Sequence, residues 1–373
     1  MKRFLFILIL FSFTGIFKSQ YNEELYKKAF SYVYENPDNA LILVQKMLKN
    51  EKNIDNKIKL YQLLSRVYMS KRDMDKSLDY VLKMKELSKS ISNPEQKIKI
   101  LTSIALQYQN MGLYSKTTES LDEHYKLCQT LPDGKFKTLY LGLNSAVRGM
   151  VYKNQDNNEL ALEKFLAGLD YVKKVGNYEN SIANSSVILY NIGYCYFYLK
   201  KYNEAEKYFI QSADVAKAVQ AESLEAFAYK GLSENFTILG KHQEAIELLK
   251  KSVNLSKKVG DLVLSEGIYK GFSDNYLALQ DWNNYEVYNK LYIETKFARE
   301  QSELASLNKS IDVLNQENNN KIEEQKGRLR IISSIIIAVS SAVFTWFLVI
   351  FIRHKRRNKL LIEKLNQINK ITN

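Results

Sequence analysis

The sequence is poor in the residues that interrupt helices, with only 3 proline and 14 glycine residues among 373. Long helices are therefore unopposed over most of the chain. Two cysteines fall on separate predicted helices, and we interpret both as buried small apolar residues rather than as a disulfide. The three histidines do not belong to a ligand set with the spacing of a metal site. The sequence predicts neither a metal site nor a cofactor.

The motifs of the common enzyme classes are also missing. The chain has no phosphate loop, GxSxG, HExxH or CxxC motif, and no paired carboxylates. Gly240-Lys241 lacks the upstream glycine of a phosphate loop, and we interpret it as a turn between two helices. The sequence therefore predicts a protein that is not an enzyme.

One uncharged run, from Ile331 to Ile352, stands out from the rest of the chain. As a helix, its 22 residues span about 33 Å. A membrane hydrocarbon core is about 30 Å thick, and core helices of soluble domains rarely run this long without a polar face. We predict a transmembrane helix over 331–352; a buried helix of a soluble domain is the alternative.

The amino-terminal end has the order of a secretory signal peptide. Lys2 and Arg3 precede an apolar stretch from Phe4 to Phe17, which as a helix reaches only about 21 Å. We predict a signal peptide over 1–19, with an uncleaved anchor as the alternative. Because Lys and Arg are denser after Ile352 than before Ile331, we expect the large part of the chain outside the cytoplasm and the carboxyl end inside.

Between residues 21 and 295 the chain repeats a pattern of small and aromatic residues. In its clearest copy, Gly193 is followed by Tyr196, Ala205 and Phe209 at offsets of 3, 12 and 16. Successive copies are 37 to 44 residues apart. The equivalent small-residue position falls at Ala40, Ser77, Thr117, Ala161, Ala205, Ala245 and Tyr285.

This pattern predicts pairs of antiparallel helices. A small residue on the first helix (Gly193, Ser233 or Ser273) lets the second helix approach, and the aromatic residues fill the remaining space. The pattern resembles the tetratricopeptide repeat, in a version lengthened to about 40 residues. We therefore predict an all-α, tetratricopeptide-type helical solenoid of six to seven units over 21–295. An irregular helical bundle is the alternative.

The inner face of such a solenoid is lined by its first helices and usually binds ligands. Residues next to the packing positions are candidates for this groove, although an ordinary packing or solvated role fits them equally well. Because they combine aromatic residues with mixed charges, we do not predict a site of the Lys/Asn type that holds a peptide carboxylate. The candidates are Tyr190, Tyr194, Phe197, Lys230, Glu234, Lys270 and Asp274.

After the repeats, residues 296–330 follow a different rhythm. Leu304, Leu307, Ile311 and Leu314 have heptad spacing, which predicts a helical stalk. A homodimeric coiled coil and a capping helix of the solenoid are the two alternatives. Residues 353–373 are predicted to form a basic cytoplasmic helix, whose Arg353–Lys359 cluster lies beside the membrane. We expect this cluster to meet anionic lipid rather than nucleic acid.

This order of segments resembles the sensor half of Bacteroidetes membrane regulators that carry an AraC-type helix-turn-helix DNA-binding domain after the span. The 21 residues after Ile352 are too few for that domain. The resemblance implies a single-pass protein of the bacterial inner membrane, with the solenoid in the periplasm and a regulatory or sensory role. Its solenoid would bind a protein or peptide. A tethered scaffold or assembly factor without signalling output is the alternative.

Overall fold

The computed structural model describes residues 22–71, 73–257 and 261–371, and these form helices with short connections and no strand. The all-α prediction is confirmed, whereas the predicted signal peptide, 1–19, lies outside the described residues. The helices are α1 (Glu23–Glu35), α2 (Pro37–Leu48), α3 (Ile54–Ser70), α4 (Met74–Ser88), α5 (Pro94–Asn110), α6 (Tyr114–Gln129), α7 (Lys135–Asn154), α8 (Asn158–Lys174), α9 (Ser181–Tyr198), α10 (Tyr202–Ala218), α11 (Glu222–Ile238), α12 (His242–Ser256), α13 (Leu262–Ala278) and α14 (Trp282–Ile371).

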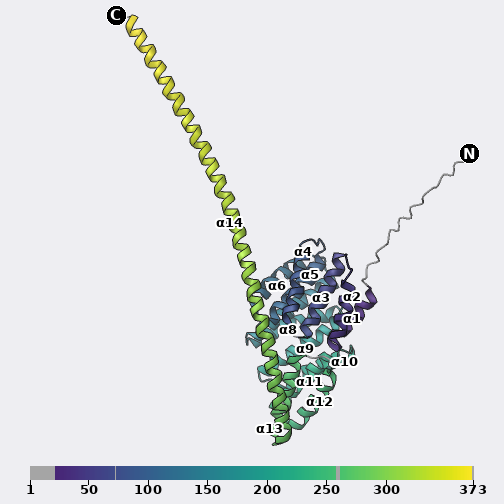
Figure 1. Ribbon diagram of the computed structural model, residues 1–373. Coiled ribbons are helices and arrows are strands. Elements are labelled where there is room, and N and C mark those ends of the chain that lie inside the picture. Colours follow the sequence, from purple (N-terminus) through teal and green to yellow (C-terminus); the bar gives the residue numbers. More distant parts are fainter. Residues whose placement is uncertain (1–21, 72, 258–260, 372–373) are drawn as a thin grey trace, which may run out of the picture. The chain divides into compact units, whose positions relative to one another are not determined.

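The chain divides after Asn308 into two compact units. In the first unit, consecutive helices form antiparallel pairs, from α1 with α2 to α13 with the start of α14 (Figure 1). First helices of neighbouring pairs also contact each other, as α7 does α9, α9 does α11 and α11 does α13. These first helices therefore form an inner row, and helices such as α8, α10 and α12 lie outside it.

Short polar side chains and proline fix where several helices begin. The side chain of Asn36 accepts a hydrogen bond from the backbone N–H of Asn39 at the start of α2, where Pro37 occupies the first turn. Asn93 and Pro94 play the same roles at α5. Such caps satisfy backbone donors that have no partner within the helix.

The turn inside most pairs contains one residue in the left-handed region, five residues before the small-residue position of the second helix. Glycine fills this place at 112 and 240, with φ of 71° and 74°. Asp156, Lys200 and Gln280 fill it with φ between 58° and 59°. These turns thus have the same backbone conformation with or without glycine. Where the residue is not glycine, the left-handed conformation is less favourable because of its side chain.

The helices pack as predicted, with small residues leaving space that aromatic side chains fill. The Phe209 ring of α10 lies between α9 and α11, where a Cβ atom on Gly193 or Gly231 would come within 2.7 or 2.5 Å of it. Gly149 gives Phe165 the same room. Both phenylalanines are fully buried, so these glycines let aromatic rings fill the space between helices.

The small-residue positions of the second helices are completely buried at 40, 77, 117, 161, 205 and 245. Tyr285, at the same place in α14, is only partly buried. Since α14 continues as one helix rather than leading into another pair, this position has room for a large side chain. Cys128 and Cys195 are both buried and unbridged, as interpreted from the sequence.

The first helix of the array also contacts the first helix of the sixth pair, because α1 contacts α11. These helices belong to pairs far apart in sequence (Figure 1). The first and sixth pairs therefore contact each other through their first helices.

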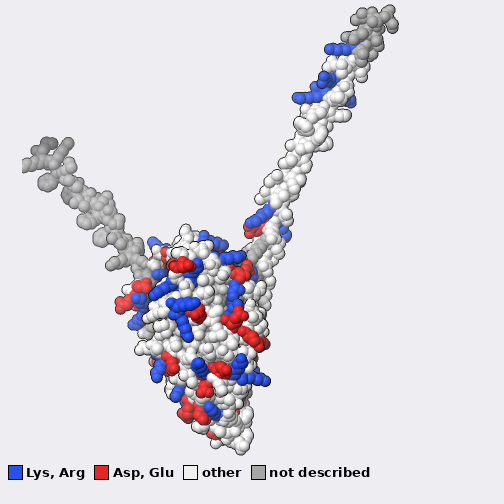
Figure 2. Space-filling view, turned by 180° about the vertical axis from the view of Figure 1, so that it is seen from behind, with Lys and Arg blue, Asp and Glu red and all other residues white. Residues whose placement is uncertain are grey.

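The second unit begins at Lys309, and its described residues are the remainder of α14, to Ile371. Among the described residues, one stretch of helix is long and apolar enough to cross a membrane, Asn318–Lys364, and none of its most apolar window is buried. The uncharged part of this stretch, residues 331–352, is a white band between groups of charged side chains in Figure 2. In the predicted stalk, Leu304 and Ile311 are exposed, while the side chains of Leu307 and Leu314 lie outside what the structure describes.

Candidate ligand-binding groove

Four of the seven predicted groove residues come together on the inner row. Tyr190 and Tyr194 on α9 face Lys230 and Glu234 on α11 through ring contacts and hydrogen bonds. The repeat spacing explains these contacts, because Lys230 and Glu234 occupy the same positions on α11 as Tyr190 and Tyr194 occupy on α9.

A closed set of hydrogen bonds links three of these side chains. The Tyr194 hydroxyl donates to Oε2 of Glu234 at 2.6 Å and accepts from Nζ of Lys230 at 2.8 Å. Lys230 also forms an ion pair with Oε1 of Glu234 at 2.6 Å. Each charge in this cluster therefore has an opposite charge or a hydroxyl beside it.

Burial and charge act in opposite directions on Lys230, whose side chain is 14% exposed. Burial alone lowers its pKa, but Glu234 and the neighbouring tyrosines raise that pKa above its ordinary value. Burial, followed by the Glu234 charge, raises the pKa of Tyr194. The cluster therefore holds a protonated lysine and a neutral tyrosine at neutral pH.

The stem of Lys230 lies against α13 at Gly267. A Cβ atom at this position would overlap Cε of Lys230. Glycine thus allows the lysine to pass close to the next inner helix, and the position links α11 to α13.

The other predicted residues have different surroundings. Phe197 is half-buried and stacks edge-on against Tyr194 and Tyr202. Lys270 and Asp274 form an ion pair along α13 and are about half exposed. Phe197 therefore belongs to the aromatic packing beside Tyr194. Lys270 and Asp274 pair with each other rather than with the Tyr194 cluster.

Sequence reasoning missed Lys153, in the last turn of α7. Its Nζ donates a hydrogen bond to Oδ1 of Asn191 on α9 and lies 5.7 Å from the centre of the Tyr194 ring. Burial lowers its pKa to about 8, a shift that Cys195 opposes and Lys230 reinforces. An alignment on Gly149 and its equivalents would have found Lys153, because it occupies the position of Phe197, Thr237 and Leu277 in the later units.

The outer edge of this cluster is apolar. Tyr198, at the end of α9, is 56% exposed, and its ring centre lies 5.9 Å from that of Tyr194. Ile238, at the same position of α11, is also 56% exposed. This part of the inner row thus combines a charged, hydrogen-bonded cluster with exposed apolar side chains, as peptide-binding surfaces commonly do.

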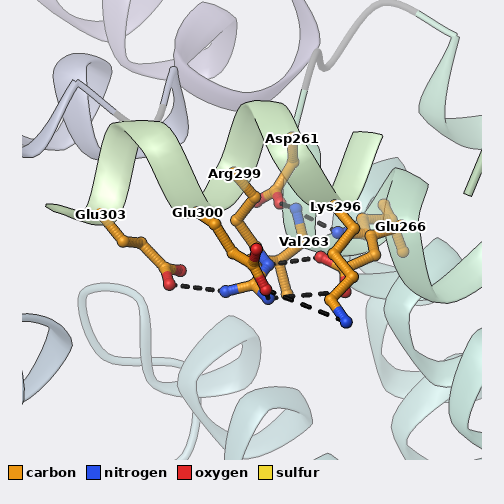
Figure 3. Close-up of polar contacts among 8 residues, drawn as sticks. Asp261, Val263, Glu266, Lys296, Arg299, Glu300 and Glu303 are labelled. Atoms are coloured by element: carbon orange, nitrogen blue, oxygen red, sulfur yellow. Dashed lines mark hydrogen bonds and ion pairs between the residues drawn. The ribbon is translucent and has the colours of Figure 1, made fainter. Parts of the chain in front are cut away.

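A second charged cluster joins α13 to α14 (Figure 3). Arg299 donates to both carboxylate oxygens of Glu266 and, at 2.5 Å, to Oε2 of Glu303. The two glutamates raise the pKa of Arg299 despite its partial burial, with the Glu266 hydrogen bond contributing most. This cluster holds the start of α14 against the inner helix that also receives Lys230.

Neither charged cluster has the ligands of a metal site. The described residues contain no group of three or more His, Cys, Asp or Glu side chains that could hold a metal ion. On the face of the repeat unit in Figure 2, Lys and Arg side chains are interleaved with Asp and Glu. This distribution suits a surface that recognises a ligand through a few local contacts.

Comparison with known proteins supports the fold. The family described as Tetratricopeptide repeat matches residues 184–258, which hold the Tyr194 cluster. No curated protein matches the chain.

Several solved structures share this architecture. NprR in complex with its cognate peptide NprX is 14% identical with a TM-score of 0.55, over 79% of this chain and 87% of that one. Aspartyl phosphate phosphatase F from Bacillus subtilis is also 14% identical, with a TM-score of 0.51 over 80% and 95%. A Rap protein complexed with Competence and Sporulation Factor is 11% identical, with a TM-score of 0.50 over 75% and 100%. The predicted tetratricopeptide-type solenoid is confirmed.

Proposed function

We propose that this chain is a single-span membrane protein whose repeat domain binds a protein or an extended peptide along the inner row. The observation that carries the proposal is the arrangement around Tyr194, where a buried polar cluster adjoins the exposed Tyr198 and Ile238. Two structures of similar fold are described as complexes with NprX and with Competence and Sporulation Factor, which supports a peptide ligand. The phosphatase activity named for another is not carried over, since likeness at this identity concerns the fold.

The proposed membrane attachment is through residues 331–352. Exposed apolar side chains throughout this run support a lipid environment, because they have no protein covering in the described chain. The denser basic cluster at Arg353–Lys359 supports a cytoplasmic carboxyl end in contact with anionic lipid. The repeat domain then lies in the periplasm of a bacterial cell, behind a signal peptide over 1–19.

The proposed role is regulatory or sensory, in line with the resemblance to the sensor half of AraC-type membrane regulators. A homodimer through the stalk at 296–330 fits the exposed Leu304 and Ile311. A tethered scaffold without signalling output is the second candidate. Transcript profiles separate the two, because only the regulatory role makes transcript levels change when the gene is deleted.

Peptide selection tests the binding proposal. The full chain, purified in detergent micelles, is used to select peptides from a displayed random library, and their Kd values are measured by fluorescence anisotropy. We expect Ile238→Arg, on the inner row, to weaken binding at least tenfold. Ile210→Arg, at an exposed position of the outer helix α10, is the matched control. Equal Kd values for both variants and the wild type would exclude the groove.

Protease treatment of spheroplasts tests the topology. We expect added protease to digest the repeat domain and to leave a carboxyl-terminal fragment with the span. Complete protection of the repeat domain in intact spheroplasts, with digestion after lysis, would reverse the proposed orientation.

A further inference from the structure

One side of the last helix of the repeat unit, α14, packs against α13. The Tyr288 ring stacks on that of Phe272, with ring centres 4.4 Å apart. Eleven residues later, which is three helical turns, Arg299 forms its ion pair with Glu266. These contacts fix which side of α14 is turned towards the repeats.

Another side of α14 is apolar and exposed. Ile293 follows Tyr288 by five residues, which places it about 140° away around the helix. Its side chain is 56% exposed, and those of Trp282 and Phe297 are 61% and 64% exposed. Large apolar side chains that gather on one side of a helix mark an interaction surface.

In earlier pairs, the corresponding face of the second helix receives the first helix of the next pair. Leu249 of α12 shows this, because a Cβ atom on Gly271 of α13 would lie 3.0 Å from it. The residue of α14 equivalent to Leu249 is Asn289. Together with Tyr285 and Ile293, it lines a shallow hollow of about 410 Å³. This face therefore has the position and shape to receive a helix.

The spacing of the exposed residues indicates a partner helix that runs alongside α14. Phe297, Leu304 and Ile311 follow one another at intervals of seven residues and are 64%, 55% and 45% exposed. Ile293 lies four residues before Phe297, as the second apolar position of a heptad requires. The next residue at the interval of seven is Asn318, and asparagine at this position favours a pair of helices in register. The apolar repeat thus begins on the repeat unit, before the predicted stalk.

A second copy of the chain supplies such a helix. A span that inserts in one direction holds the α14 helices of all copies parallel, and a two-fold axis between two copies brings identical faces together. The charges on this face suit that arrangement. No ion pair of Lys290 occurs among the described residues, and Glu286 and Glu294 lie one turn before and after it. In a parallel pair, Lys290 of each copy can reach these two carboxylates of the other copy.

Resting on the proposed single-span topology, we propose that the face of α14 formed by Trp282, Ile293 and Phe297 binds the same face of a second copy. The two repeat domains then contact each other directly, in addition to any contact between the stalks. Arg299 is two residues from Phe297, so the contact between copies adjoins the ion pair that holds α14 against α13.

Single cysteines in the full chain test this contact in membranes of expressing cells. The native Cys128 and Cys195 are completely buried, so the unsubstituted chain is the background control. Ile293→Cys and Phe297→Cys probe the face. Val287→Cys is the matched control, because Val287 is 55% exposed but lies about one-third of a turn around α14 from Ile293. Copper phenanthroline is the oxidant, and the fraction of cross-linked dimer is measured on non-reducing gels.

We expect Ile293→Cys and Phe297→Cys to form dimer at least tenfold faster than Val287→Cys. Self-association in detergent micelles gives an independent measurement by sedimentation equilibrium. Ile293→Glu should weaken the dimer at least tenfold, and Val287→Glu should leave it unchanged. Because both side chains are exposed, the thermal midpoints of these variants by circular dichroism should equal that of the wild type under monomeric conditions.

A cysteine at Ile311 separates this contact from a dimer of the stalk alone. Cross-linking of Ile311→Cys without cross-linking of Ile293→Cys would overturn the inferred face and still support the stalk dimer. Equal rates for Ile293→Cys and Val287→Cys would show random collision and overturn the face as well. The peptide groove is independent of these results, since Ile238→Arg tests it.

Discussion

Glu266 on α13 accepts hydrogen bonds from Nε and Nη2 of Arg299, a residue 33 positions later on α14 (Figure 3). The neighbour of Glu266 in the chain is Gly267, against which the stem of Lys230 lies. One turn of α13 therefore contacts both Lys230, which belongs to the Tyr194 cluster, and the start of α14. A ligand that moves Lys230 acts next to the residue that holds α14.

Breaking this pair should loosen the start of α14. Both side chains are about one-fifth exposed, so replacing Arg299 with alanine leaves Glu266 partly buried without its partner. We expect Arg299→Ala to lower the local stability of α13 and α14 by about 1–3 kcal/mol. Amide hydrogen exchange measures this change. Lys174→Ala, which breaks a largely exposed pair with Asp170, should leave amide exchange nearly unchanged.

Glycine at 231 should be required for packing. A Cβ there meets the Phe209 ring, and overpacking of this kind costs about 1–3 kcal/mol. We expect Gly231→Ala to lower the urea midpoint of the full chain. Gly327→Ala is the matched control, because no atom lies within 4 Å of its added Cβ and alanine is a better helix former. A destabilised Gly327→Ala, or a neutral Gly231→Ala, would contradict this account.

The turn position shared by Lys200 and Gly240 gives a reciprocal test. Lys200 has φ of 59°, a left-handed conformation that costs a side chain about 1–2 kcal/mol, partly offset by the entropy that glycine loses on folding. We expect Lys200→Gly to stabilise the chain by about 0.5–1 kcal/mol. Gly240→Ala, at φ of 74°, should destabilise it by a similar amount in urea unfolding. Shifts of the same sign in both variants would refute the equivalence.

His124 should make the stability depend on pH. It is fully buried, its Nδ1 lies 3.0 Å from the Asn144 amide nitrogen, and its Nε2 has no hydrogen-bond partner in the described structure. Burial, with a smaller effect of Arg148, lowers its pKa from 6.5 to about 4.

The unfolded chain therefore binds a proton at His124 at higher pH than the folded chain does. The free energy of unfolding should fall as the pH drops from 6.5 to 4, by roughly 3 kcal/mol at most from this residue. Urea unfolding at pH 7 and pH 4.5 measures the loss. His124→Gln should show a smaller loss between the two pH values, although its stability at pH 7 is lower. An equal loss in both proteins would assign the pH dependence to other groups.

Much of the fold could be predicted because the repeats impose a regular spatial register. The recurring small and aromatic residues around Gly193 predict helix pairs, and Phe209 fills the space that this glycine leaves. Tyr285 departs from the pattern without disturbing the array, since no further pair packs on α14. The order of the helix pairs could therefore be predicted from the spacing of these residues in the sequence.

The site was less predictable, because its properties depend on contacts between units. Tyr190 and Tyr194 were candidates for a ligand surface, yet both are largely taken up by packing and by the Lys230–Glu234 pair. Lys153 was missed because a lone lysine at the end of a helix is ordinary in a sequence. Only its placement against Asn191, 38 residues away, distinguishes it.

The contact between α1 and α11 changes how this array should unfold. A linear array of helix pairs, each touching only its neighbours, frays from its ends and loses its units one after another. Here the first helix pair (α1 and α2) also contacts the sixth pair (α11 and α12). Its unfolding therefore removes contacts from the second pair and from the sixth pair at once. The array from α1 to α12 should therefore melt as a cooperative block, while the pair formed by α13 and α14 remains the free terminus.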